Sequence, residues 1–295
     1  MSSTRKLLYG ITAFYVVGII LLIVIFGFGH KNNVFQIQNE FKLDNWVSLG
    51  VFSINRAVVY LILATIATIV TMIWIADRMH QRPNKVQTAV EVLFSLMRDN
   101  VTRGNLDDSM AARWFPFLGA LFLFIWFSNL IGYIPLPTNS EETFNLFGAH
   151  SPDFALYAAT ANISVPLALA LVVFIAFNWT GIRAQGPIGY LKSLIPSGVH
   201  GPMLLLIAPL EVVSTFMRLV SLTIRLFANI LAGHLIILFM SGGLAVILGL
   251  SFLGWFTLPV GIAVYLFELG LVATLQAFIF ATLAAIYIGG SVTHH

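Results

Sequence analysis

Long apolar segments alternate with short polar ones along this chain. We predict membrane-spanning helices, because about 20 consecutive apolar residues suffice to cross a bilayer. The predicted helices cover the apolar segments 7–29, 57–76, 114–135, 156–178, 203–246 and 250–289. A β-barrel would show short strands of alternating polarity instead. The predicted fold class is therefore an all-α integral membrane protein with about six membrane helices.

The last two apolar segments, 203–246 and 250–289, are twice as long as one span requires. A helix of about 40 residues is ~60 Å long, whereas the hydrocarbon core is ~30 Å thick. Each segment is either one strongly tilted helix or two spans joined by a tight turn. Only the SGG sequence at 241–243 resembles a loop. We therefore favour two long helices that meet near residues 241–250.

The first apolar segment could be confused with a secretory signal. Its apolar core is about 22 residues long, whereas a signal has 7–15 and ends in an A-x-A-like cleavage site. No clear site of that kind follows it. We interpret 7–29 as a retained spanning helix, with a cleaved signal as the alternative.

Charged residues are scarce and lie mainly in the loops. Only 9% of the residues are charged, against about 25% in soluble proteins, and the absence of cysteine excludes disulfides and thiolate metal sites. The segments 77–113 and 179–202 carry Lys and Arg, whereas 136–155 carries only acids. The positive-inside rule then places both termini in the cytoplasm. The cations indicate topology, and we expect no nucleic-acid partner.

One cytoplasmic segment, 83–101, has a helical pattern. Pro83 and Asn84 form a plausible helix start. One face of the helix would be apolar, with Val86, Val90, Leu93, Leu96 and Met97. Such a helix either lies along the membrane or a partner, or is a solvated loop helix, and both interpretations stay open.

A line of polar residues crosses the apolar segment 203–246. At 100° per residue, one face of this helix presents Glu211, Arg218, Ser221, Arg225 and Asn229. His234 points to the opposite side. An arginine at the centre of a span costs at least ~2.5–3.5 kcal/mol, and deprotonation cannot relieve it.

The Arg225 side chain could extend to the membrane–water interface, or it could form an ion pair with Glu211 or Glu268 of its own chain. We favour a third reading, a fixed positive charge presented to a titratable carboxylate. Glu268 on the last helix and His234 on the preceding helix can both titrate. We predict that these two residues relay protons. For Thr274 we expect only a hydrogen bond between helices.

Small and capping residues add two expectations. Ala228, Ala232 and Gly233 would let another backbone, of a partner or of this chain, come close to the Arg225 helix. Asn162, at the start of a predicted span, is expected to cap a helix.

Five ordered motifs resemble one family. SLTIRLFANILAGHLI, at 221–236, is similar to the signature of subunit a of the F-type ATP synthase, the ATPase protein 6 family. Similar sequences are LIAPLEVVSTFMR with Glu211, LQAFIFATLAAIYI with Gln276, WFSNLIGYIP with Asn129 and Pro135, and ATANISVPLALAL. The resemblance covers about 50–290.

This resemblance implies a stator membrane subunit that does not itself hydrolyse ATP. It would form two proton half-channels against a rotating ring of subunit c, with Arg225 preventing a direct proton leak between them. Asn229 and Gln276 would hold the arginine or line the access path. Glu211, His234 and Glu268 would relay protons on the side away from the cytoplasm.

The resemblance also implies partners and a location. The partners are the subunit c ring, the subunit b peripheral stalk, the remaining ATP synthase subunits and the lipid membrane, with no cofactor or metal. The location is a bacterial plasma membrane. Residues 1–49 would form an N-terminal membrane helix with an external loop, and 50–295 the channel domain. H⁺ and Na⁺ both stay open as the coupling ion.

The sequence departs from the family pattern at Glu268. This residue lies eight positions before Gln276, where the family implies seven, and a difference of 100° conflicts with a relay role. Two other classes of membrane protein are alternatives. A transporter binding an anionic solute at Arg225 would show two related halves, which we do not find. In a purely structural subunit, the polar line would serve no purpose.

Overall fold

The computed structural model describes Val17 and residues 45–49, 52–78, 85–146, 149–155, 157–193, 202–240 and 254–292. These ranges are mainly helical, which confirms the all-α membrane class. Apart from Val17, the predicted helix 7–29 lies outside the described residues. So does the predicted meeting point of the last two helices near 241–250.

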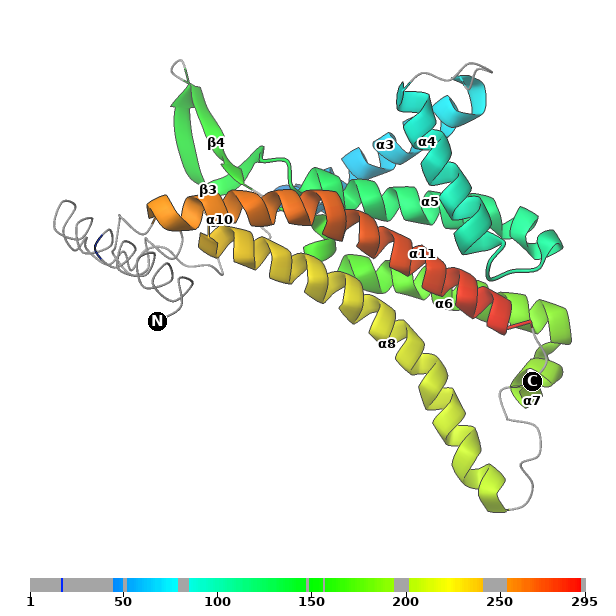
Figure 1. Cartoon of the computed structure of the whole chain (residues 1–295). Coiled ribbons are helices and arrows are strands. Elements are labelled where there is room, and N and C mark those ends of the chain that lie inside the picture. Colours follow the sequence, from blue (N-terminus) through cyan, green and yellow to red (C-terminus); the bar gives the residue numbers. More distant parts are fainter. Residues whose placement is uncertain are drawn as a thin grey trace, which may run out of the picture. The chain divides into compact units, whose positions relative to one another are not determined.

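Five helical segments in the described ranges are long and apolar enough to cross a membrane. The first four are α3 (Arg56–Arg78), α5 (Asp108–Gly132), α6 (Ser164–Gln185) and α8 (Pro202–Leu238). The fifth is a continuous run of α10 (Gly254–Phe267), the π-helix η5 (Glu268–Val272) and α11 (Ala273–Gly290). Figure 1 labels these helices.

Each of the two long apolar segments forms one helical run. The spans are Ile207–Leu238, with 32 residues, and Thr257–Gly290, with 34 residues. Their helical lengths of about 48 and 51 Å exceed the ~30 Å hydrocarbon core, so each must tilt strongly or extend beyond it. The single-helix prediction is confirmed in these ranges.

The chain divides into two compact units. One combines Met1–Lys42 with Ala232–Glu268, and the other combines Leu43–Leu231 with Leu269–His295. The second unit therefore holds α3 to α7, most of α8, and α11. His234 and Glu268 belong to the first unit, and Arg225 and Gln276 to the second.

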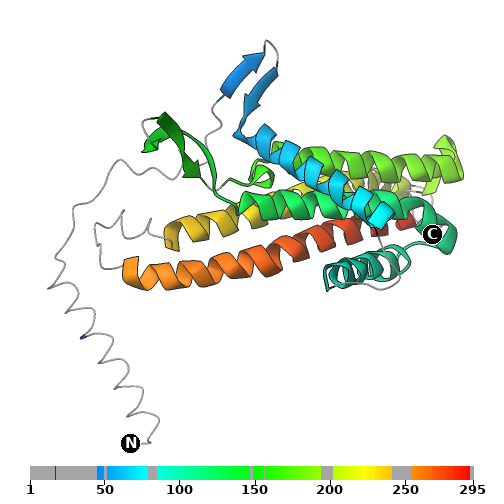
Figure 2. The same cartoon turned by 90° about the horizontal axis from the view of Figure 1, so that it is seen from above.

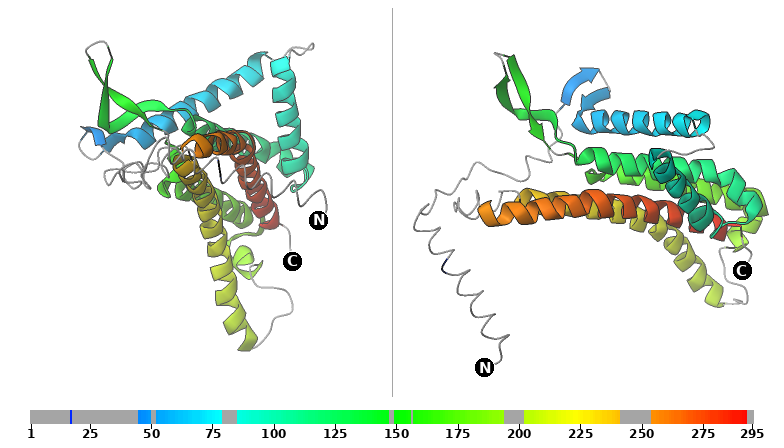
Figure 3. Two further views of the ribbon diagram at one scale, coloured as in Figure 1. Left: turned by 60° about the vertical axis from the view of Figure 1, so that its left-hand side comes forward. Right: turned by 45° about the horizontal axis from the view of Figure 1, so that its top comes forward.

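In the second unit, α5 packs against both α3 and α11, and Figure 2 shows α3 crossing it. Alanines on α11 have no exposed surface there, which lets neighbouring helices come close. The core includes Leu118, Ile125, Leu226, Ile230, Ala277, Phe280, Ala281 and Ala284. The first half of α8 diverges from α11 (Figures 1 and 3). Its outer apolar side chains, such as Phe216 and Met217, are consequently exposed.

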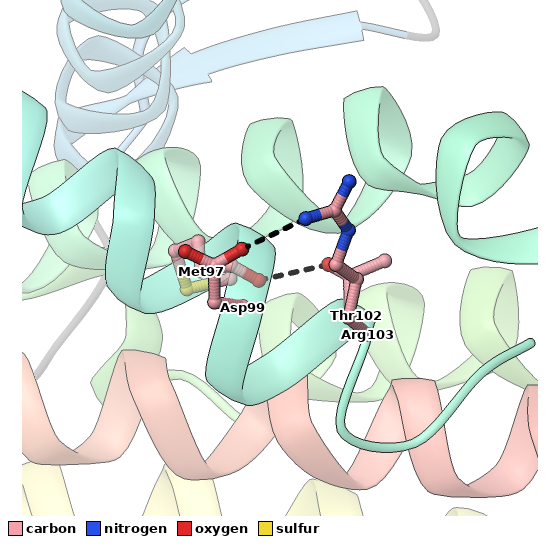
Figure 4. Close-up of polar contacts among 4 residues, drawn as sticks. All are labelled: Met97, Asp99, Thr102 and Arg103. Atoms are coloured by element: carbon pink, nitrogen blue, oxygen red, sulfur yellow. Dashed lines mark hydrogen bonds and ion pairs between the residues drawn. The ribbon is translucent and has the colours of Figure 1, made fainter. Parts of the chain in front are cut away.

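The helix predicted within segment 83–101 is confirmed as α4 (Lys85–Ser95), continued by the π-helix η1 (Leu96–Thr102). Thr102 Oγ1 donates to the Met97 carbonyl over 2.8 Å, five residues earlier, and Arg103 pairs with Asp99 at 3.4 Å (Figure 4). Met97 and Val101 are buried in the core. This face therefore packs on the protein itself.

Two antiparallel hairpins occupy segments that the sequence analysis treated as loops. They pair β1 (Asn45–Leu49) with β2 (Phe52–Asn55), and β3 (Leu136–Leu146) with β4 (Ala149–Ala155). These segments contain too few consecutive apolar residues to form a membrane span. The hydropathy pattern therefore gave no signal for strands there.

The helix predicted at 156–178 begins eight residues later, at Ser164. Ala159–Ala161 instead form a buried 3₁₀ turn, η2, and apolar composition cannot distinguish such a turn from the start of a span. Asn162 Oδ1 accepts a hydrogen bond from the Ser164 N–H over 3.0 Å. The Asn162 side chain therefore satisfies a backbone N–H at the start of α6, although the residue in the N-cap position is Ile163. The short helix α7 (Pro187–Ser193) follows α6.

Candidate functional site

Arg225 lies near the middle of the span Ile207–Leu238, and its side chain is exposed. Its neighbours along the helix divide into two faces. Leu222, Leu226 and Ile230 are buried in the core, whereas Ser221 and Asn229 are exposed with Arg225. The predicted polar face therefore exists and is turned away from the core of this unit.

The Arg225 guanidinium makes no hydrogen bond or ion pair within the described residues. Glu211, one of its two candidate partners, lies fourteen residues earlier on the same helix. That separation is about 21 Å along the axis, too far for an ion pair. Pairing of Arg225 with Glu211 is thereby excluded.

Arg218, seven residues before Arg225, has a different environment. Its guanidinium carbon lies 5.4 Å from the centre of the Tyr287 ring on α11, a distance at which a cation–π attraction operates. It is only half-buried. The two arginines on this helix face therefore differ, because Arg218 has an aromatic partner within the described residues and Arg225 has none there.

Asn229 and Gln276 connect α8 to α11. Asn229 Nδ2 donates to Gln276 Oε1 over 3.1 Å. Gln276 is 2% exposed, and its buried Nε2 has no acceptor among the described residues. A buried donor without an acceptor is unusual in a folded protein and has capacity for a further hydrogen bond. The structure therefore brings together Asn229 and Gln276, one helical turn from Arg225.

In the other unit, His234 and Glu268 are both buried. The Glu268 carboxyl group lies against the backbone of Gly233. A Cβ placed at Gly233 would be 2.6 Å from Glu268 Cδ and 2.9 Å from Oε1. A larger side chain at position 233 would force the Glu268 carboxyl group to shift, so the absence of a Cβ at Gly233 allows that group to lie against the backbone.

The π-helix η5 begins at Glu268. A π turn takes up one residue more than an α turn, so eight residues through η5 rotate the helix about as far as seven in an α-helix. The 100° difference inferred from the sequence assumed a regular α-helix and was wrong for this reason. The spacing of Glu268 and Gln276 no longer conflicts with a relay role.

Asn129 is a polar residue whose contacts the sequence analysis missed. Its side chain has no exposed surface, accepts a hydrogen bond from Thr160 Oγ1 over 2.9 Å, and donates to the Ala273 carbonyl over 3.4 Å. Trp126 Nε1 donates to Thr274 Oγ1 nearby over 3.0 Å, which confirms the predicted helix-to-helix bond. A lone asparagine in an apolar helix was the available signal for Asn129.

Arg56, at the start of α3, was also missed. It is 3% exposed, and its guanidinium carbon lies 5.3 Å from the centre of the Tyr157 ring. Burial raises the pKa of the Tyr157 hydroxyl, and the nearby Arg56 partly opposes this shift. In the described part of the chain, no group of three or more His, Cys, Asp or Glu residues could hold a metal ion.

Comparison with known proteins adds independent evidence. The profile of the family described as ATP synthase A chain matches residues 58–289. Relatives named ATP synthase subunit a include one from Maricaulis maris, 33% identical over 84% of this chain and 94% of its own length. Another, from Frankia alni, is 32% identical over 87% of this chain and 85% of its own length.

Some relatives are much longer than this chain. The subunit a of Anaeromyxobacter dehalogenans strain 2CP-C is 32% identical over 82% of this chain, which spans only 58% of that relative. The family match nevertheless includes α8 and α11, with Arg225, Asn229 and Gln276. On the profile match and these relatives together, the chain belongs to the ATP synthase A chain family.

Proposed function

We propose that this chain is the stator membrane subunit of a rotary F-type ATP synthase. It forms two proton half-channels against a ring of subunit c and couples proton translocation to ring rotation and ATP synthesis. The observation that carries the proposal is Arg225, a permanent charge at mid-span without a partner in the described residues. Relatives named ATP synthase subunit a support it.

Arg225 acts on a ring carboxylate by electrostatics. At about 4 Å and an effective dielectric constant near 20, opposite charges attract by on the order of 4 kcal/mol. This corresponds to a preference of roughly a thousandfold for the ionised carboxylate. A protonated carboxyl group must therefore release its proton before it passes the arginine, and protons cannot cross without rotation.

Asn229 and Gln276 position the reacting groups. Asn229 follows Arg225 by four residues, on the same face of α8. Its amide is held by Gln276 Oε1, while the buried Gln276 Nε2 can donate to an arriving carboxylate. The pair thus orients a carboxylate beside the guanidinium without adding charge.

We propose a different division of the three relay residues from the one that the resemblance implies. In the continuous helix α8, Glu211 precedes Arg225 and His234 follows it. The two cannot serve the same half-channel, because the arginine separates the half-channels. In our proposal Glu211 lines the cytoplasmic half-channel, and His234 with Glu268 lines the other.

The partners and location follow from the same proposal. The ring of subunit c contacts the exposed apolar face of α8 around Arg225, and subunit b and the remaining ATP synthase subunits complete the complex. The membrane is a bacterial plasma membrane, with the termini in the cytoplasm.

The test is ATP-driven proton pumping by the whole complex in inverted membrane vesicles. Arg225→Ala is expected to abolish pumping, because no fixed charge then blocks the direct leak. The matched control is Arg218→Ala, which removes a positive charge seven residues earlier on the same helix. The Arg218 guanidinium lies on the Tyr287 ring and is therefore not the charge that faces the ring of subunit c. Full coupled pumping by Arg225→Ala, or purification of the chain without a ring of small two-helix subunits, would overturn the proposal.

A further inference from the structure

A pocket of about 310 Å³ lies where α5 begins and α6 ends. It is lined by Met110, Arg113 and Trp114 of α5, by Trp179, Thr180, Arg183 and Ala184 of α6, and by Val292 after α11. All these residues belong to the second unit. Figure 1 shows the end of α11 beside the last turns of α6.

The pocket is positively charged. Arg113 and Arg183 are both exposed, and no acidic residue is among those that line it. The Arg183 guanidinium carbon lies 5.3 Å from the centre of the Trp179 ring, so the cation rests on an aromatic face. Neither arginine forms an ion pair within the described residues. Two unneutralised cations in one hollow attract an anion.

The position of the pocket identifies the kind of anion. Arg113 is in the second turn of one span, and Arg183 is in the last turn of the next. Consecutive spans run in opposite directions, so both arginines lie at the same face of the membrane. Trp114 and Trp179 are typical residues of the membrane–water boundary, and Met110, Ala184 and Val292 provide an apolar wall.

We propose that this pocket binds the phosphate headgroup of an anionic glycerophospholipid. The two guanidinium groups contact the phosphate, and the tryptophan rings and apolar wall contact the glycerol and the first acyl carbons. Basic pockets between membrane helices bind anionic headgroups in this way. The site is independent of the polar face at Arg225 and of the activity proposed above.

A second cationic pocket provides the contrast. Arg98 and Arg103 line a neighbouring hollow of about 230 Å³ together with Asp108, and Arg103 already pairs with Asp99. One of the two cations there is thus paired, and a carboxylate is among the lining residues. This pocket holds the same number of arginines but is not expected to select an anionic lipid.

The test uses tryptophan fluorescence of the full chain, purified and reconstituted in bilayers. Phosphatidylglycerol with brominated acyl chains should quench Trp114 and Trp179 more strongly than brominated phosphatidylethanolamine at the same mole fraction. At about fivefold in affinity per cation, Arg113→Gln with Arg183→Gln should weaken the preference for phosphatidylglycerol by up to about 30-fold. Trp179→Phe should remove part of the excess quenching.

Two matched variants and one competitor decide between explanations. Arg98→Gln with Arg103→Gln, and Arg113→Lys with Arg183→Lys, should both keep most of the preference. Equal quenching by the two lipids would overturn the proposal, as would equal losses in the two glutamine doubles, which would indicate diffuse surface charge. Displacement by millimolar inorganic phosphate would assign the pocket to a free anion. Excess quenching that disappears in the whole complex would assign it to a neighbouring protein segment.

Discussion

Gly233→Ala tests whether the position of the Glu268 carboxyl group controls proton transfer. The added Cβ would lie 2.6 Å from Glu268 Cδ, whereas ordinary contact begins at 3.4 Å, so the carboxyl group must retreat by about 0.8 Å. Proton transfer requires donor and acceptor atoms within about 2.6–3.2 Å, and a misplacement of 1 Å can reduce a rate by about 100-fold. We expect Gly233→Ala to lower proton flux by roughly 10- to 100-fold.

The assay is ATP-driven acidification of vesicles that contain the whole complex, with the amount of assembled complex measured in parallel. Gly270→Ala is the matched control, because its added Cβ meets nothing within 4 Å, and it should pump at the parent rate. Overpacking reduces stability by about 1–3 kcal/mol, which a thermal melt of the complex separates from a loss of transfer.

A compensating change makes the test specific. Glu268→Asp shortens the side chain by one methylene and withdraws the carboxyl group from position 233. In Gly233→Ala it should restore part of the flux if steric displacement is the cause. An assembled Gly233→Ala complex that pumps at the parent rate would refute the reasoning, because the carboxyl group would then have moved without consequence.

Two further predictions concern helix packing in the second unit. Gly132→Ala would place a Cβ 2.6 Å from the Ala158 Cβ and 2.8 Å from its Cα. Because the backbone is involved, we expect a loss of about 1–3 kcal/mol in unfolding free energy, measured by denaturant titration in detergent, and an unchanged value would contradict this. For Asn229→Ala and Gln276→Ala, a double-mutant cycle should give a coupling energy of about 0.6 kcal/mol, and strict additivity would show that their hydrogen bond does not stabilise the fold.

The sequence predicted the membrane class and the approximate positions of the five spans in the described ranges, because apolar length decides both. The single-helix interpretation of the two long segments is confirmed within Ile207–Leu238 and Thr257–Gly290. The hairpins and the late start of α6 at Ser164 were not predicted. These features depend on pairing and turn geometry in segments of mixed polarity, for which no regular period exists.

The candidate site was predicted unevenly. A 100° period identified the face of α8 with Arg225 and Asn229, and this face is exposed as expected. The same period gave the wrong rotation for Glu268, because it cannot reveal a π turn such as η5. Nor could it show that the carboxyl group of Glu268 lies against Gly233, which depends on two helices that are distant in sequence.

The clearest example is the pair of arginines on α8. Arg218 and Arg225 are seven residues apart, so sequence periodicity assigns them the same face and the same chemistry. In the structure their environments differ, because different side chains of α11 lie near each arginine. Tyr287 engages Arg218, whereas Gln276 engages Asn229 and leaves Arg225 without a partner in the described residues. One helical turn from Arg225, α11 thus presents a neutral amide, Gln276, and not a second aromatic ring or a carboxylate. This choice of residue keeps Arg225 available for a charge outside the chain.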